Sequence, residues 1–107
     1  MINVATINEI LALYKKHGWN VRRVLLSDEL RVNLTDSLQN LFGAAEIVTS
    51  RLNGVWFSRP AKHGGETWEL RRLSEAPFAL VEVFEEDIAD DIREDVLRAT
   101  EKRMRAD

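Results

Sequence analysis

The sequence contains no cysteine among its 107 residues. Without a thiol the chain forms no disulfide, binds no metal through thiolates and has no cysteine nucleophile. Histidine is scarce as well: only His17 and His63 occur, and neither has the spacing to other histidines or carboxylates that is typical of metal ligands. We therefore expect no metal ion and no cofactor.

Long hydrophobic segments are also missing. No apolar stretch approaches the about 20 residues that cross a bilayer. The first residues lack the positively charged segment ahead of an apolar run that marks a signal peptide. With the absence of cysteine, this predicts a cytoplasmic protein without membrane contact. The composition, 45% hydrophobic and 31% charged, is that of a globular chain, and the length predicts a single domain over residues 1–107.

The common motifs of catalysis are absent too. The segment His63-Gly64-Gly65-Glu66 has the pattern of neither a dinucleotide loop nor a P-loop, and it is typical of a turn between strands. Ser58 precedes Arg59-Pro60 instead of standing in a G-x-S-x-G elbow. These patterns favour a protein that is not an enzyme.

Two long helices are predicted at the ends of the chain. Thr6 and Glu9 form a capping box, with Thr6 as N-cap, and the apolar spacing that follows predicts a helix that ends before Gly18. A second helix is predicted over residues 87–104, where acidic residues at the start and basic residues at the end complement the helix macrodipole.

The middle of the chain has the pattern of a sheet. Ser27 is a predicted N-cap, and one or two short helices follow it as a crossover up to Phe42. The strands are predicted from β-branched and apolar alternation, with turn residues between them, over residues 21–26, 46–52, 55–59, 67–73 and 78–84. We expect an α+β fold with two layers, in which residues 46–84 form an antiparallel meander and both terminal helices pack on one face of the sheet.

The dipeptide Asn53-Gly54 predicts the register of this sheet. Asn followed by Gly favours a type I′ turn, so residues 46–52 and 55–59 are expected to form a two-residue hairpin. Period-two alternation then separates a core face from an outer face. The outer face, together with the next strand, carries Ile47, Thr49, Arg51, Trp56 and Arg71. If no helix covers it, this face is a candidate homodimer interface.

A carboxylate in the last predicted strand suggests a different site. Glu82 lies within an apolar run, where burial raises the pKa of a carboxyl unless a cation pairs with it. An ion pair with Arg51, Arg71 or Arg72 is one interpretation. The other is a pocket between sheet and helices lined by His63, Trp68, Arg72 and Glu82.

Arginine near the strands raises the question of nucleic acid. Arg51, Arg59 and Arg71 with Trp56 form a set that resembles a stacking surface for a single strand. However, the net charge of −3 and the isoelectric point near 5.4 argue against binding of phosphates.

The sequence thus predicts a small non-catalytic domain that acts through protein–protein contacts, with self-association across the outer sheet face. The alternatives are a small-ligand protein or enzyme with a site around Glu82, Arg72 and His63, and a protein that binds single-stranded nucleic acid.

Overall fold

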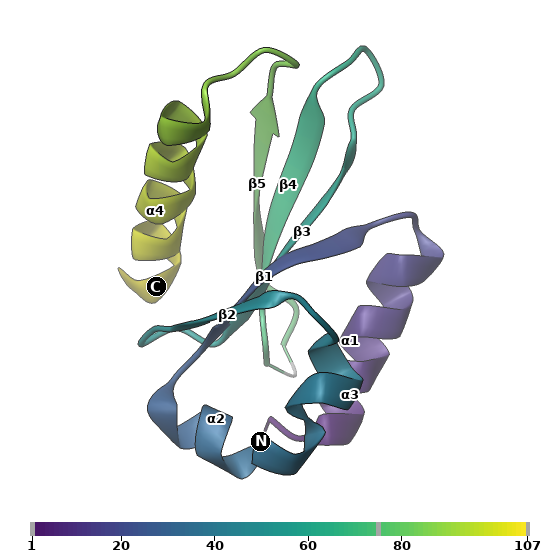
Figure 1. Ribbon diagram of the computed structural model, residues 1–107, viewed down its shortest axis with the longest axis vertical. Coiled ribbons are helices and arrows are strands. Elements are labelled where there is room, and N and C mark those ends of the chain that lie inside the picture. The colour runs from purple at the N-terminus through teal and green to yellow at the C-terminus, as the bar shows by residue number, and fades with distance from the viewer. Residues whose placement is uncertain (1, 75, 107) are drawn as a thin grey trace.

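The computed structural model describes residues 2–74 and 76–106, which form helices around one five-stranded sheet (Figure 1). This confirms the predicted α+β class. The elements in chain order are α1 (Val4–Lys16), β1 (Asn20–Leu26), α2 (Asp28–Asn33), the 3₁₀ turn η1 (Thr35–Ser37), α3 (Leu38–Phe42), β2 (Glu46–Thr49), β3 (Gly54–Pro60), β4 (Glu66–Arg72), β5 (Ala79–Phe84) and α4 (Asp90–Ala106).

The sheet is mixed, with the strand order β2-β1-β3-β4-β5. Strands β3, β4 and β5 form an antiparallel meander, which confirms the later part of the meander predicted over residues 46–84, but β2 is not part of it. The predicted hairpin around Asn53-Gly54 is wrong, because β1 lies between β2 and β3, parallel to the first and antiparallel to the second. The crossover through α2 and α3 is the connection that a parallel pair requires.

Burial explains why β1 takes this central position. Val24, Leu25 and Leu26 are all buried, so this strand needs neighbours on both sides and cover on both faces. Asn53 joins strands instead of turning a hairpin: its side-chain Oδ1 accepts a hydrogen bond from Ser27 N at 2.7 Å, and its carbonyl accepts one from Leu73 N at 2.9 Å. Gly54 has no positive φ, but a Cβ there would lie 3.2 Å from the carbonyl oxygen of Arg71. Close approach of β4 therefore favours glycine at this position.

The helices cover opposite faces of the sheet, which corrects the prediction that both long helices share one face. The α1-side core contains Ile7, Ile10, Tyr14, Val24, Leu26, Leu30, Leu34, Phe42, Val55, Phe57 and Leu73. The α4-side core contains Leu25, Leu52, Trp56, Trp68, Leu70, Phe84, Leu97 and Met104. The consecutive residues Val55, Trp56 and Phe57 in β3 are all buried, and such a run requires cover on both faces.

A β-bulge in β1 places two arginines on the α4 side. The pairing with β3 shifts between Val21 and Arg23, so Arg22 is the extra residue. The guanidinium of Arg22 lies 4.5 Å from the ring centroid of Trp68, and Arg23 bonds to Glu94 on α4. Both side chains therefore lie on the α4 side of the sheet, and Arg23 reaches the helix itself.

The helix ends follow the expected capping chemistry with one correction. Ser27 caps α2, since its Oγ accepts from Leu30 N at 3.2 Å, as predicted. Thr6 is not the cap of α1. Asn3 is, and its Oδ1 accepts from Thr6 N at 2.9 Å, which starts the helix earlier at Val4.

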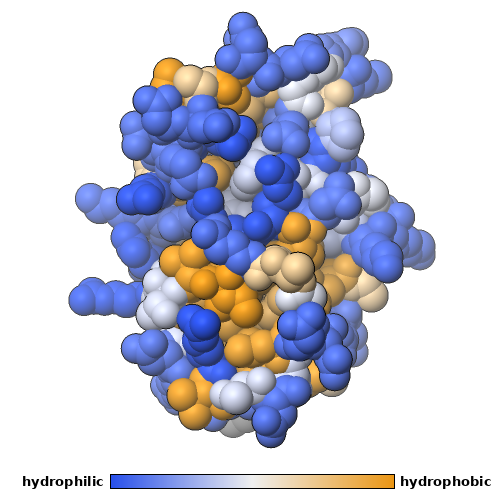
Figure 2. Space-filling model, viewed as in Figure 1, coloured by the Kyte–Doolittle hydropathy of each residue, from blue (hydrophilic) through white to orange (hydrophobic). Residues whose placement is uncertain are grey.

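Figure 2 shows how polarity is distributed over the face seen in Figure 1. The upper half, where α4 and the far ends of β4 and β5 lie, is largely hydrophilic. Apolar surface collects in the lower half, where Figure 1 places β2, α2 and α3. The edge strand β2 therefore lies close to the more apolar part of this face.

Candidate functional site

The residues predicted for the outer face do not form one surface. Ile47 is half-buried against the α1-side core, and Arg71 pairs with Val55 on the same side, but β1 and β3 separate their two strands. Trp56 faces the opposite side, where it is completely buried and its indole N–H donates to Glu101 at 2.8 Å. Thr49 and Arg51 are exposed at the end of β2. Arg51 and Trp56 are therefore not the cross-strand pair that the hairpin predicted.

The residues predicted for a pocket are only partly brought together. Trp68 and Glu82 are cross-strand partners facing α4, as predicted for Trp68. His63 is exposed in the turn before β4, at the opposite end of that strand from Arg72. Of the four residues, only Arg72 lines either of the two cavities described below.

Glu82 is held by α4. Its Oε1 accepts a hydrogen bond from Thr100 Oγ1 at 2.9 Å and lies 3.8 Å from Arg103 Nη1. These partners differ from the three arginines that the sequence suggested. Glu82 thus joins the edge strand β5 to α4.

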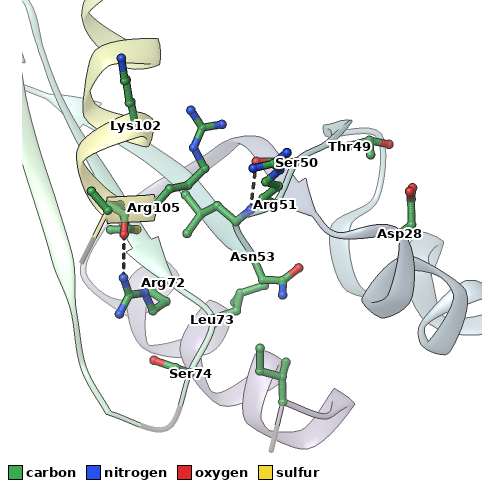
Figure 3. Close-up of a pocket in the computed structure, with 14 residues that line it drawn as sticks. Asp28, Thr49, Ser50, Arg51, Asn53, Arg72, Leu73, Ser74, Lys102 and Arg105 are labelled. Carbon is green, nitrogen blue, oxygen red and sulfur yellow. Dashed lines mark hydrogen bonds between the residues drawn. The ribbon is translucent and has the colours of Figure 1, made fainter.

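A large cavity lies elsewhere, at the end of the sheet where β2 and β4 finish and α4 ends (Figure 3). It has a volume of about 1060 Å³. Four basic side chains line it: Arg51 after β2, Arg72 at the end of β4, and Lys102 and Arg105 on α4. Asp28 is the one carboxylate among its described lining residues. The cavity is therefore strongly cationic.

The fold explains why these cations meet. The parallel strands β1 and β2 finish at the same end of the sheet, where β3 starts and β4 finishes. Arg72 Nη2 donates to the carbonyl oxygen of Met104 at 2.8 Å, which fixes the end of α4 against β4. Figure 3 shows Arg105 extending from α4 toward Ser50 and Arg51. Three elements far apart in sequence thus contribute charge to one opening.

A second cavity, of about 440 Å³, continues from the first along β2. The two share Thr49, Ser50 and Arg105 among their lining residues, and the second adds Arg98 of α4. We call the two cavities together the basic groove. It runs between α4 and the edge strand β2.

The carboxylates of the second cavity already have partners within the chain. Arg23 donates to Glu46 at 2.7 Å and to both oxygens of Glu94 at 3.1 and 2.7 Å. These hydrogen bonds lower the pKa of Glu94 and raise that of Arg23. Glu101 accepts from the Trp56 indole. Each of these three carboxylates therefore accepts a hydrogen bond from within the chain, and Arg23 is the cation that pairs with two of them.

The exposed cations are not matched in this way. Within residues 2–74 and 76–106, no ion pair shorter than 4.0 Å involves Arg51, Arg98, Lys102 or Arg105. All four side chains are exposed. Lys102 and Arg105 also complement the negative end of the α4 macrodipole, and Arg72 donates to the Met104 carbonyl at that end, but Arg51 comes from another element and has no such role. An excess of positive charge therefore faces the groove.

Among the described residues, no group of three or more histidine, aspartate or glutamate side chains is placed to hold a metal ion. In the same part of the chain, no helix is both long and apolar enough to cross a membrane.

Comparison with known proteins gives no relative: no family model, no curated protein and no solved structure matches the chain.

Sequence reasoning named three lining residues of the groove, but it assigned Thr49 and Arg51 to the outer face and Arg72 to a pocket around Glu82. It missed Arg98, Lys102 and Arg105 because basic residues near the end of a helix are already explained by the macrodipole. These residues are recognised as a site only because they lie close to Arg51 and Arg72 in the folded chain. That proximity depends on the strand order, which the sequence did not predict.

Proposed function

We propose that the protein is a non-catalytic domain that acts through protein–protein contacts, and that the basic groove binds a carboxylate-rich segment of a partner protein. The observation that carries the proposal is the convergence of Arg51, Arg72, Lys102 and Arg105 on one cavity whose described lining contains a single carboxylate. Arginine is well suited to this role, because its planar guanidinium pairs with a carboxylate through two parallel hydrogen bonds.

Charge supports a protein partner over a polyphosphate. The chain as a whole has a net charge of −3, so a long nucleic acid would meet repulsion outside the groove. A short acidic segment needs to contact only the groove. Its attraction is expected to act mainly on the rate of association and to weaken with salt.

The test is a titration with a labelled polyglutamate peptide at low and at physiological ionic strength. We expect binding that weakens with salt and that falls about tenfold or more, equivalent to about 1.4 kcal/mol, in Arg51→Glu/Arg105→Glu. The matched control is Lys16→Glu/Lys62→Glu, which makes the same change of charge at exposed residues that do not line the groove.

Two outcomes would count against the proposal. One is the absence of any polyglutamate binding at low salt. The other is binding of a single-stranded oligonucleotide through the same arginines with no binding of polyglutamate, which would favour the nucleic-acid alternative.

Self-association is a second candidate, favoured by one observation. Val81 and Val83, in the edge strand β5, are 50% and 69% exposed on the face opposite α4. A second copy that covered them would bury apolar surface. Sedimentation of the protein at increasing concentration tests this. The dimer should weaken in Val81→Thr/Val83→Thr and persist in the control Val32→Thr, which changes an exposed valine on α2. A wild-type protein that stays monomeric at all concentrations would refute self-association.

A further inference from the structure

The strand beside the basic groove has an open edge. In the sheet order β2 has a neighbour on one side only, namely β1. Ser50 N donates to Leu26 O at 3.0 Å, and the alternation of a parallel ladder then directs the backbone N–H and C=O groups of Ile47 and Thr49 away from β1. Such an edge is a template for another strand.

The groove follows this edge. The smaller cavity is lined by Glu46, Val48 and Thr49 of β2, and the larger cavity continues past the end of the strand to Arg51. A segment that paired with β2 would therefore lie beside the smaller cavity, and the larger cavity would begin at the Thr49 end of that strand.

From these observations we infer that the acidic segment binds in extended form, as an additional strand on the open edge of β2. This inference rests on the function proposed above and specifies how the partner binds. Main-chain hydrogen bonds to Ile47 and Thr49 would hold the segment, and alternate side chains would enter the groove toward Arg98 and Arg105.

Alternation determines which sequence fits. In an added strand, every second side chain points to the α4 side, at a spacing of about 6.6 Å, and these positions favour glutamate or aspartate. The side chains between them point to the other face, where Ile47 is packed against the α1-side core. Apolar residues are favoured there, so the best ligand alternates acidic and apolar residues.

The other edge of the sheet does not offer the same combination. Glu82 lies near the middle of β5 and faces α4, where it would repel an acidic strand. The carboxylate of β2, Glu46, is the first residue of its strand and pairs with Arg23 at 2.7 Å, so it leaves the rest of that edge without negative charge. The inference therefore applies to β2 and not to β5.

The test uses a capped six-residue peptide of alternating glutamate and valine. It is compared with an analogue whose backbone nitrogens are methylated at alternate residues, which removes the hydrogen-bond donors and keeps the charges. We expect the methylated peptide to bind at least about tenfold more weakly. In the complex with the unmodified peptide, hydrogen exchange of the Ile47 and Thr49 amides should slow about tenfold or more, because these amides become hydrogen-bonded.

The possible results separate this inference from the proposed function. Equal binding of both peptides, with unchanged exchange at Ile47 and Thr49, would overturn strand addition and leave the groove as a site for acidic segments. If neither the peptides nor polyglutamate binds, both proposals fail. Thr49→Pro gives a second check, since it removes one outward N–H and leaves the ladder to β1 in place, and it should weaken binding of the unmodified peptide alone.

Discussion

The side chain of Tyr14 contributes to the fold both by packing and by a hydrogen bond. Its ring stacks on Phe57, with centroids 4.0 Å apart and ring planes at 10°, and its hydroxyl donates to Glu69 on β4. Burial and the neighbouring carboxylate raise the pKa of the hydroxyl above its usual value. The phenol therefore stays neutral at pH values where a tyrosine in the unfolded chain has begun to ionise.

This predicts a loss of stability at alkaline pH. The unfolded tyrosine loses its proton near pH 10 while the folded one keeps it, so the contribution of Tyr14 is present below about pH 10 and declines as pH rises through the folded pKa. Tyr14→Phe should lower the free energy of unfolding at pH 7 by about 1 kcal/mol through the lost hydrogen bond. It should also remove this alkaline decline. Urea denaturation of both proteins at pH 7 and above pH 10 measures the difference, and an equal decline in both would contradict the prediction.

At the scale of elements, most of the strands could be predicted and their pairing could not. Alternation and turn residues placed the strands close to their observed positions, because these signals are local. The Asn53-Gly54 signal failed because it competed with a nonlocal requirement: β1 is buried on both faces and takes the place beside β3. Once β1 is central, Asn53 is used to bond Ser27 and Leu73. The basic groove could not be predicted from the sequence for the same reason, because Arg51 and Arg105 come close together only in this strand order.

The attachment of α4 to β1 gives a prediction at this scale. The two hydrogen bonds from Arg23 lower the pKa of Glu94, so its contribution to stability is present above the pKa of the unfolded carboxyl, near 4.3. It is lost as pH falls through the lower folded pKa. Glu94→Gln should therefore destabilise the protein at pH 7, by about 1 kcal/mol or less, and weaken the dependence of stability on pH below about 4.3.

Denaturation at pH 7 and pH 3 checks this, with Asp95→Asn as the control. Asp95 is the exposed neighbour of Glu94 on the same helix, and its substitution makes the same change of charge. A larger effect of Asp95→Asn at pH 7 would show that net charge, and not the bond to Arg23, governs the result.

The whole molecule consists of two cores on opposite sides of one sheet. The α1-side core and the α4-side core both include residues of β1 and β3. Consecutive residues alternate between the two cores, Val24, Leu25 and Leu26 in β1 and Val55, Trp56 and Phe57 in β3. Neither core can lose these strands without exposing the other. We therefore expect the two cores to unfold together.

Substitutions on each side test this coupling. Ile7→Ala and Leu97→Ala each remove a completely buried side chain, one from each core, and each should cost about 2–5 kcal/mol. Both substitutions should lower the midpoint of a single unfolding transition, and the curves from circular dichroism and tryptophan fluorescence should coincide. The exposed residues Leu13 and Ile92 provide matched alanine controls on α1 and α4, expected to change stability by about 0.5 kcal/mol or less. Separate transitions for the two probes would show that the cores are independent.

The bulge at Arg22 has a consequence for how the chain can change in length. Side chains alternate across a strand, so one extra residue acts as a frameshift in that alternation. Arg23 to Leu26 are in one frame, and Val21, which pairs with Phe57 in the α1-side core, is in the other. Deleting Arg22 would place Val21 directly before Arg23, and regular alternation would then keep Val21 on the side of the α1-side core, opposite Arg23. A protein of the same fold can therefore lack this residue without any change in the hydrophobic pattern that precedes it, and would lose only the cation that lies over Trp68.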